Sequence, residues 1–451
     1  MAGAPGTTHV NIQLKSLLVD SGGLESDAGW NAWLSAQRSG RPFQLEQLVI
    51  EGPTGYLKRN TPPPNAKMSA RRVRIANLRP EGASWSELEA FVKSWKPSEL
   101  ELVNLAFDDD SRPALGATSE LHKLPALTAL TITGCRLVDA DFSGSNLRNT
   151  VGTLTLSNNE LTRLDLSALA AFQSLYAADL SHNSISQLSA DDKKPSASGG
   201  ELSLQLAYNQ LHTLDLSALA ALPNLQLFDA SSNRIGTLQR SDGASANPLL
   251  ESLLLERNQI ADSVSCELFA GYPKLKIVDL SDNQIAALNV SDAQLEAGKS
   301  GHLCIFDLRN NRIEWLSPRV VHWAKAALDA SRDRCTRGSA RYNPTSAERA
   351  AYGGEAPLVL LAGNPWSCNC DTWNATREAA AVLNDSLNAA CAVDQRADCL
   401  SRAMPKCALR STLLINHLLP MHICYVKHLR LVGEVRSSRI DRETRSIINN
   451  H

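Results

Sequence analysis

The stretch VGTLTLSNNEL, residues 151–161, decides the fold, because the same eleven-residue phrase returns along the middle of the chain. Apolar residues recur at places one, four, six and eleven of the phrase, and Asn or Cys fills place nine. A repeat of this length indicates stacked structural units rather than one globular core. Eight versions, at steps of 24 to 28 residues, begin at Leu127, Val151, Leu175, Glu201, Leu225, Leu250, Leu275 and Leu303.

The alternation around places four to six, as in Leu154 and Leu156, predicts a short strand with one buried face. One such strand cannot bury its apolar side alone, so we expect neighbouring units to stack into a parallel sheet over a leucine core. Place-nine amides should turn inward and bind unpaired backbone groups, with Cys135 as a small buried substitute. This structural ladder comprises Asn159, Asn183, Asn209, Asn233, Asn258, Asn283, Asn311 and Asn364.

These phrases resemble the leucine-rich repeat family. The resemblance implies an α/β solenoid with a curved parallel sheet on its concave side and irregular or helical segments on its convex side. Weaker phrases begin at Leu45, Ala70 and Pro97 and lack the place-nine Asn, so we interpret them as degenerate repeats. The predicted organisation is an N-terminal capping or disordered segment (1–44), degenerate repeats (45–126), regular repeats (127–316), an irregular repeat with a loop (317–355), the last repeat with a cysteine-rich cap (356–407) and a tail (408–451).

The segment LAGNPWSCNCDTW, residues 361–373, resembles the start of the C-terminal cysteine-rich cap of extracellular leucine-rich repeat proteins. The resemblance implies a small disulfide-bonded cap whose candidate cysteines are Cys368, Cys370, Cys391, Cys399 and Cys407. A zinc site is the alternative, but the C-x-C spacing does not suit a zinc knuckle.

Two further cysteines lie inside the repeats. Cys266 and Cys304 have no cysteine at the same place of an adjacent repeat, so no disulfide is predicted for them. Asn289, Asn374 and Asn384 lie in N-x-S/T sequons, which accept glycans in secreted proteins.

The bulk composition excludes some classes of function. A net charge of −2 offers no broad basic field for nucleic acid. No apolar stretch is long enough to predict a membrane span, and no secretory signal is recognisable near Met1. Because disulfides form in oxidising compartments, the cap favours an extracellular or cell-surface location. The missing signal and the unpaired repeat cysteines favour the alternative, an intracellular (cytoplasmic) scaffold or regulatory subunit.

The sequence contains no G-x-S-x-G, H-E-x-x-H or phosphate-loop motif, so we predict a non-enzymatic protein without cofactor or metal. Its function is then expected to be binding of a protein, with a glycan as the alternative, on the concave face. Four aspartates at place five would make that face negative and suit a basic partner, or would only keep it soluble. The expected contact residues are Tyr176, Asp179, His182, Tyr208, Asp229, Arg257, Asp279, Asp282, Asp307 and Arg309.

Overall fold

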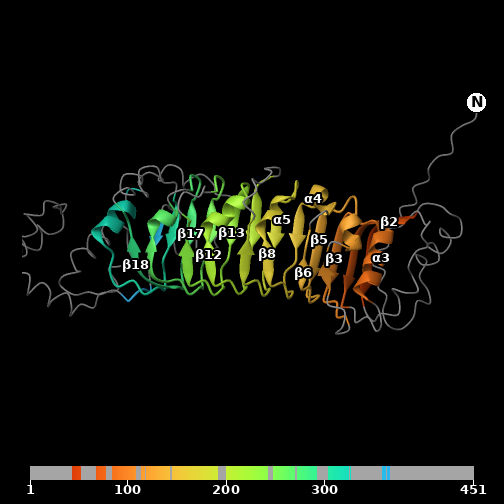
Figure 1. Cartoon of the computed structure of the whole chain (residues 1–451), viewed down its shortest axis with the longest axis horizontal. Coiled ribbons are helices and arrows are strands. Elements are labelled where there is room, and N and C mark those ends of the chain that lie inside the picture. The colour runs from red at the N-terminus through yellow and green to blue at the C-terminus, as the bar shows by residue number, and fades with distance from the viewer. Residues whose placement is uncertain are drawn as a thin grey trace, which may run out of the picture.

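A computed structural model gives the architecture of the chain, and the main feature is one long sheet of twelve parallel strands (Figure 1). In the sheet the strands follow one another in chain order. The described residues are 43–51, 68–77, 84–107, 113–116, 118–142, 145–190, 200–241, 247–269, 272–291, 303–324, 326, 358–361 and 363–365.

Each strand of the main sheet falls on one repeat phrase, and the three weaker phrases supply the first three strands. The prediction of a parallel sheet built from one short strand per repeat is confirmed. The strands are β1 (Phe43–Glu51), β2 (Met68–Ala76), β3 (Glu99–Val103), β5 (Ala129–Thr133), β7 (Thr153–Thr155), β9 (Ala177–Asp179), β11 (Leu202–Gln205), β13 (Leu225–Asp229), β15 (Ser252–Leu254), β17 (Ile277–Asp279), β19 (Ile305–Asp307) and β20 (Leu358–Leu360).

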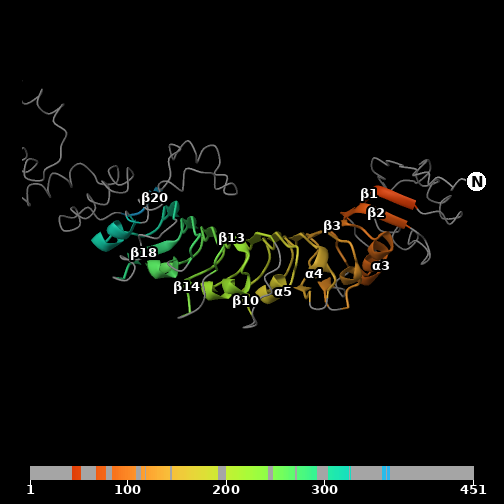
Figure 2. The same cartoon turned by 90° about the horizontal axis from the view of Figure 1, so that it is seen from above.

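Short helices and four two-stranded sheets make the return path of each repeat. Figure 2 shows the main sheet on the concave side of the curved solenoid and the helices on its convex side. The small sheets pair β4 (Ala114–Leu115) with β6 (Asp139–Ala140), β8 (Arg163–Asp165) with β10 (Gln187–Ser189), β12 (Thr213–Asp215) with β14 (Thr237–Gln239), and β16 (Ala261–Ser265) with β18 (Gln284–Asn289). The α-helices are α3 (Trp85–Trp95), α4 (Leu147–Thr150) and α5 (Leu166–Ala170), and the 3₁₀ helices are η1 (Glu120–Lys123), η2 (Leu216–Ala221) and η3 (Cys266–Phe269).

No helix among the described residues is both long and apolar enough to cross a membrane. The longest of them, α3, begins with a capping box, in which Ser84 and Glu87 bind each other's backbone N–H groups. Its apolar face, including Leu88 and Phe91, is buried in the same core as the leucines of the sheet. This helix therefore closes the convex side where the phrases are least regular.

One repeat departs from the expected register. Place one of the phrase that starts at Glu201 is polar, and that side chain is exposed. A register shift between Leu202 and Ser203 lets the backbone bulge, and the side chain of Leu202 enters the core instead. The burial of a leucine, rather than strict spacing, sets the start of this strand.

The place-nine amides form the predicted ladder, and each one joins two repeats. Asn183 shows the pattern: its Nδ2 donates to the carbonyls of Leu156 and Leu180, at 2.9 and 3.1 Å, and its Oδ1 accepts from the Leu161 N–H at 3.0 Å. Equivalent bonds extend to Asn364 at the last described strand. Because both donor and acceptor atoms are used, the amide satisfies backbone groups that the turn leaves without partners.

Cys135 takes the ladder position in the first regular repeat, as predicted. The side chain is fully buried, and its thiol lies 3.6 Å from the Leu102 carbonyl and 3.4 Å from that of Thr133. Burial raises the pKa of this thiol to about 11, so it stays protonated and can act as a weak donor. Asn159 of the next repeat accepts from the Cys135 N–H and completes the connection.

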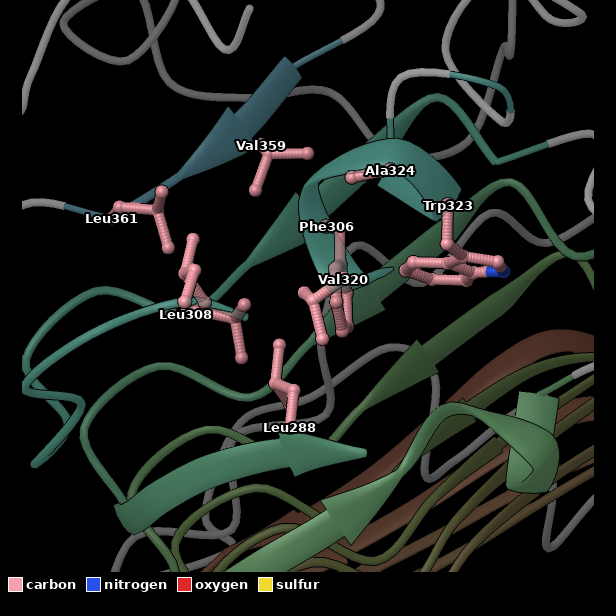
Figure 3. Close-up of a pocket in the computed structure, with 9 residues that line it drawn as sticks. Leu288, Phe306, Leu308, Val320, Trp323, Ala324, Val359 and Leu361 are labelled. Carbon is pink, nitrogen blue, oxygen red and sulfur yellow. The ribbon is translucent and has the colours of Figure 1, made fainter. Parts of the chain in front are cut away.

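A small apolar pocket lies at the C-terminal end of the described core (Figure 3). β20 is the parallel neighbour of β19 in the main sheet. Trp366 and the five candidate cap cysteines lie outside the described residues, so the disulfide-bonded cap stays a prediction. The pocket is lined by Leu288, Phe306, Leu308, Leu316, Val320, Trp323, Ala324, Val359 and Leu361. Twelve stacked parallel strands, a leucine core and the Asn ladder together constitute the architecture of a leucine-rich repeat solenoid.

Removal of one ladder amide should be costly. In Asn233→Ala, the carbonyls of Leu206 and Ala230 and the N–H of Leu211 lose their bonds to this side chain, and we expect a loss of roughly 3 kcal/mol in the free energy of unfolding. Urea denaturation followed by circular dichroism measures the loss. The control is Asn224→Ala, which removes one bond to the Gly200 carbonyl and should cost less than about 1 kcal/mol. Equal losses in the two variants would contradict the role of the ladder.

Candidate functional site

The outward-facing side chains of the main sheet differ along the solenoid. In the N-terminal strands, opposite charges face each other across β2 and β3, where Arg72 pairs with Glu99 at 2.6 Å and Arg74 with Glu101. Within each ion pair the two opposite charges neutralise each other at the surface. The described strands β1 to β3 therefore present little unbalanced charge to a partner.

The C-terminal strands carry an excess of carboxylates. In the four repeats of β13, β15, β17 and β19, places five, seven and eight hold five acidic side chains and two arginines. Both arginines form ion pairs within the chain. The Arg257 Nη1 atom lies 3.0 Å from a Glu256 carboxylate oxygen, and the Arg309 guanidinium makes a bidentate contact with the Asp307 carboxylate. These places therefore hold three more carboxylates than arginines.

Place eight of every phrase from Asn158 to Asn310 adopts a left-handed backbone conformation, with φ between 53° and 56°. The N–H group there donates to a carbonyl of the next repeat, for example from Tyr208 to Ser231 at 3.0 Å. Asn and Asp tolerate this conformation, whereas other non-glycine residues hold it at a cost of about 1–2 kcal/mol. The members of this turn column are Asn158, His182, Tyr208, Ser232, Arg257, Asp282 and Asn310.

An aromatic pair occupies two adjacent positions of the turn column. The rings of His182 and Tyr208 stack with their centroids 4.3 Å apart and their planes 7° from parallel. Half of the Tyr208 surface remains exposed. These two rings stack at nearly the spacing of neighbouring strands, along the solenoid axis. We call the pair of His182 and Tyr208 the aromatic ladder.

Tyr176, the other exposed tyrosine among the described residues, lies at a different edge of the sheet. It occupies place two, where the strand begins, and its ring lies over Gly152. A Cβ atom at Gly152 would come within 2.8 Å of the Tyr176 ring, so glycine is required for this ring position. The structure therefore separates Tyr176 from the aromatic ladder of His182 and Tyr208.

The place-five aspartates have a local structural role that the sequence analysis missed. In Asp179, Asp229, Asp279 and Asp307, Oδ1 accepts a hydrogen bond from the N–H group two residues further on, at 2.9 to 3.0 Å. This Asx-type turn directs the chain out of the strand. The signal in the sequence was Asp followed two residues later by Ser or Arg. The place-five carboxylates therefore serve the turn of their own repeat, although the repeat of Leu254 forms the same turn without one.

Asp279 and Asp307 differ from the expectation that place five is exposed. They are paired across β17 and β19 and are only 6% and 3% exposed. Burial, followed by the nearby negative charge of Asp307, raises the pKa of Asp279 to about 6. The expectation that both residues offer an exposed contact is wrong, because neighbouring side chains bury them.

Glu256 and Ser232 are absent from the contacts predicted by sequence. Glu256 occupies place seven, where most phrases have Ser or Ala, and its carbonyl accepts from the Ser232 N–H at 2.8 Å. Burial, and then the charges of Asp229, Asp282 and Asp307, raises the pKa of the Glu256 carboxyl, while Arg257 opposes the shift. The neighbouring carboxylates add to the effect of burial, because like charges disfavour ionisation.

The cysteines give a mixed result. Cys135 and Cys266 are free thiols and buried, whereas Cys304 is disulfide-bonded. The expectation that Cys304 has no disulfide partner is therefore wrong.

Of the three sequons, one lies in the described part of the chain. Asn289 is the last residue of β18 and is exposed. This strand belongs to the small sheet with β16 and not to the main sheet, so the side chain is away from the concave strands. Asn374 and Asn384 are outside the described residues. Within the described ranges, no group of three or more His, Cys, Asp or Glu side chains could hold a metal ion.

No protein-family model and no curated protein matches this sequence. Among solved structures, the chain is similar to a leucine-rich repeat protein of Leptospira interrogans, with 16% identity, a TM-score of 0.40 and 74% of each chain covered. An internalin from Listeria monocytogenes has 19% identity and a TM-score of 0.39, over 71% of this chain and 82% of that one. The leucine-rich repeat domain of APL1B has 17% identity and a TM-score of 0.43, over 82% and 88%. At such values the similarity transfers no function, and the fold assignment rests on the chain's own strands and ladder.

The buried carboxyl of Asp279 should make stability depend on pH. Its folded pKa of about 6 lies above the ordinary aspartate value of 3.8, so its stabilising contribution is present below pH 3.8 and is lost as the pH rises through 6. Asp279→Asn keeps an acceptor for the Ser281 N–H and removes the charge. We expect its melting temperature to exceed that of the wild type by about 2 to 6 °C at pH 7.5, with the gain shrinking toward pH 4.

Asp229→Asn is the matched control, because Asp229 makes the same bond to a serine N–H and is only half-buried. Its melting temperature should change little at either pH. Thermal unfolding by scanning calorimetry gives both values. A gain in Asp279→Asn that is the same at pH 4 and pH 7.5 would show that burial of the charge is not its cause.

Proposed function

We propose that this chain is a non-enzymatic recognition protein that binds a protein partner on the concave face of its main sheet, from the aromatic ladder toward the C-terminal strands. The observation that carries the proposal is Tyr208, a half-exposed aromatic side chain in a backbone conformation that disfavours it. Exposed tyrosines are frequent anchors of interfaces, and strain of this kind concentrates at functional sites.

Charge favours a protein over a glycan as the partner. The excess of carboxylates on β13 to β19 suits a basic surface, and complementary charge increases the rate and specificity of association. A neutral glycan would gain nothing from this charge. The ion pairs of β2 and β3 offer no comparable imbalance, so the N-terminal strands are not part of the proposed surface.

We further propose that the protein is extracellular or exposed at the cell surface. Three observations support this location: the disulfide at Cys304, the Asn-Pro-Trp-x-Cys-x-Cys sequence that begins at Asn364, and an exposed sequon at Asn289. Disulfides persist in oxidising compartments. A glycan at Asn289 would project from the small sheet and leave the concave face accessible. The alternative, a cytosolic scaffold, requires these cysteines to be reduced.

The proposed location is tested by mapping the disulfides and the glycan of the expressed protein. When the full chain is expressed through a secretory route, we expect non-reducing peptide mass spectrometry to find Cys304 in a disulfide, Cys368 and Cys370 bonded within the 391–407 region, and a glycan on Asn289. Asn289→Gln should remove that glycan mass without changing the disulfides. Free thiols at all three cysteines in a stably folded protein would favour the cytosolic scaffold.

The binding face is tested with a glycan shield. Gln205→Asn combined with Ala207→Ser places a sequon on β11, in the middle of the main sheet, and binding of labelled protein to a panel of intact cells is scored by flow cytometry. The shielded variant should lose binding, because the added glycan covers the concave face. The variant without the Asn289 glycan should bind like the wild type. Undiminished binding by the shielded variant would contradict the proposed face.

A further inference from the structure

We propose that the turn column contains a slot for an arginine side chain of the partner, formed by the Tyr208 ring, the small Ser232 beside it and the carboxylates of Asp229, Glu256 and Asp282. The inference deepens the proposed function and rests on it, since it specifies the chemistry that the concave face recognises. The guanidinium of the partner would stack on Tyr208 and place its charge among the carboxylates.

The geometry of the column creates the space. One face of the Tyr208 ring is stacked on His182 at 4.3 Å, and the ring is nearly parallel to its neighbour. The next position on the opposite side is Ser232, as the backbone bond from Tyr208 N–H to the Ser231 carbonyl shows. Ser232 contributes only a hydroxymethyl group. Two repeats span about 9.6 Å, which leaves room at place eight for one planar group between Tyr208 and Arg257.

The side chain of Arg257 does not need this space. Its Nη1 atom lies 3.0 Å from the Glu256 carboxylate, and 59% of the Arg257 side chain and 32% of the Glu256 side chain are exposed. A planar cation that enters the slot can stack on Tyr208, where cation–π attraction adds to dispersion. Arg suits such a site better than Lys, because its guanidinium is flat and weakly hydrated.

The charges around the slot are unbalanced. The charges that act on Glu256 are those of three carboxylates, Asp229, Asp282 and Asp307, and of one cation, Arg257. Arg234 is a further exposed cation, two residues after Ser232. The pKa of Glu256 is raised by burial and by the other carboxylates, so this group gains most from an added cation. Asp282 is exposed, and its Oδ1 accepts only one bond from this column, from Asn310 at 2.9 Å.

The backbone supplies the second argument. Tyr208 holds φ at 56°, a position where Asn158 and Asn310 of the same column are the residue types that fit. A tyrosine that is disfavoured by its backbone and half-exposed to water contributes little to folding. Replacement by Asn should therefore keep or improve stability while it removes the stacking surface. A purely structural Tyr208 would behave in the opposite way.

The test uses the full chain and fluorescein-labelled oligoarginine peptide, with binding measured by fluorescence anisotropy at low ionic strength. Wild-type protein should bind oligoarginine more tightly than oligolysine of equal length, and a citrulline peptide should not bind. Tyr208→Asn should weaken oligoarginine binding roughly 10-fold and remove the preference over oligolysine. Glu256→Gln should weaken binding of both cationic peptides.

Tyr176→Asn is the matched control, because it removes an equally exposed tyrosine from the opposite edge of the same sheet. It should leave oligoarginine binding unchanged. In parallel, Tyr208→Asn should unfold at a temperature no lower than the wild type. Together these results would separate a binding role for Tyr208 from a structural one.

Two outcomes would overturn the slot. The first is equal binding of oligoarginine by wild type and Tyr208→Asn, with oligolysine bound as well, which would indicate diffuse charge attraction. The second is the absence of oligoarginine binding to the wild type. Neither outcome contradicts the proposed function, whose test is the glycan shield. Loss of cell binding in the shielded variant together with a failed peptide assay would retain the concave face and reject the arginine slot.

Discussion

The hydrogen bonds of the place-nine asparagines hold the rest of the structure in register. A short strand of three to five residues, as in most repeats, has few backbone bonds to its neighbours. Each ladder amide adds donors to two repeats and an acceptor for one of them, as in Asn183. The buried amide is satisfied only when the repeats stack in one arrangement, since an unmade bond in the core is costly. The leucines supply the hydrophobic driving force, and the amides select the register.

This register also determines what the protein can present to a partner. With places four, six, nine and eleven in the core, places five and eight face outward in columns that continue from strand to strand. The same turn that brings the Asn side chain inward gives place eight its left-handed backbone. A side chain at place eight therefore stands at the rim of the sheet at the spacing of the strands, which allows the rings of His182 and Tyr208 to stack. The candidate site is a consequence of the solenoid turn.

The sequence predicted the parallel sheet and the ladder, because these depend on a period that is visible in the residues. It misjudged details in which neighbouring repeats decide. Glu201 was assigned to a core place that Leu202 fills through a bulge. Asp279 and Asp307 were expected on the surface, although they face each other in a buried pair. The sequence also could not show that Arg257 and Arg309, both expected to contact a partner, each form an ion pair within the chain.

The sequence by itself determined that this protein is a solenoid of leucine-rich repeats, because the pattern of apolar residues and asparagines is a local property repeated along the chain. Only the tertiary structure decided which outward residues act together. Tyr176 and Tyr208 look equivalent in the sequence, yet one lies over Gly152 at the start of a strand and the other stacks on His182 at the end. The surroundings of Glu256 were likewise set by four stacked repeats, because charges from several strands reach it only after the sheet has formed.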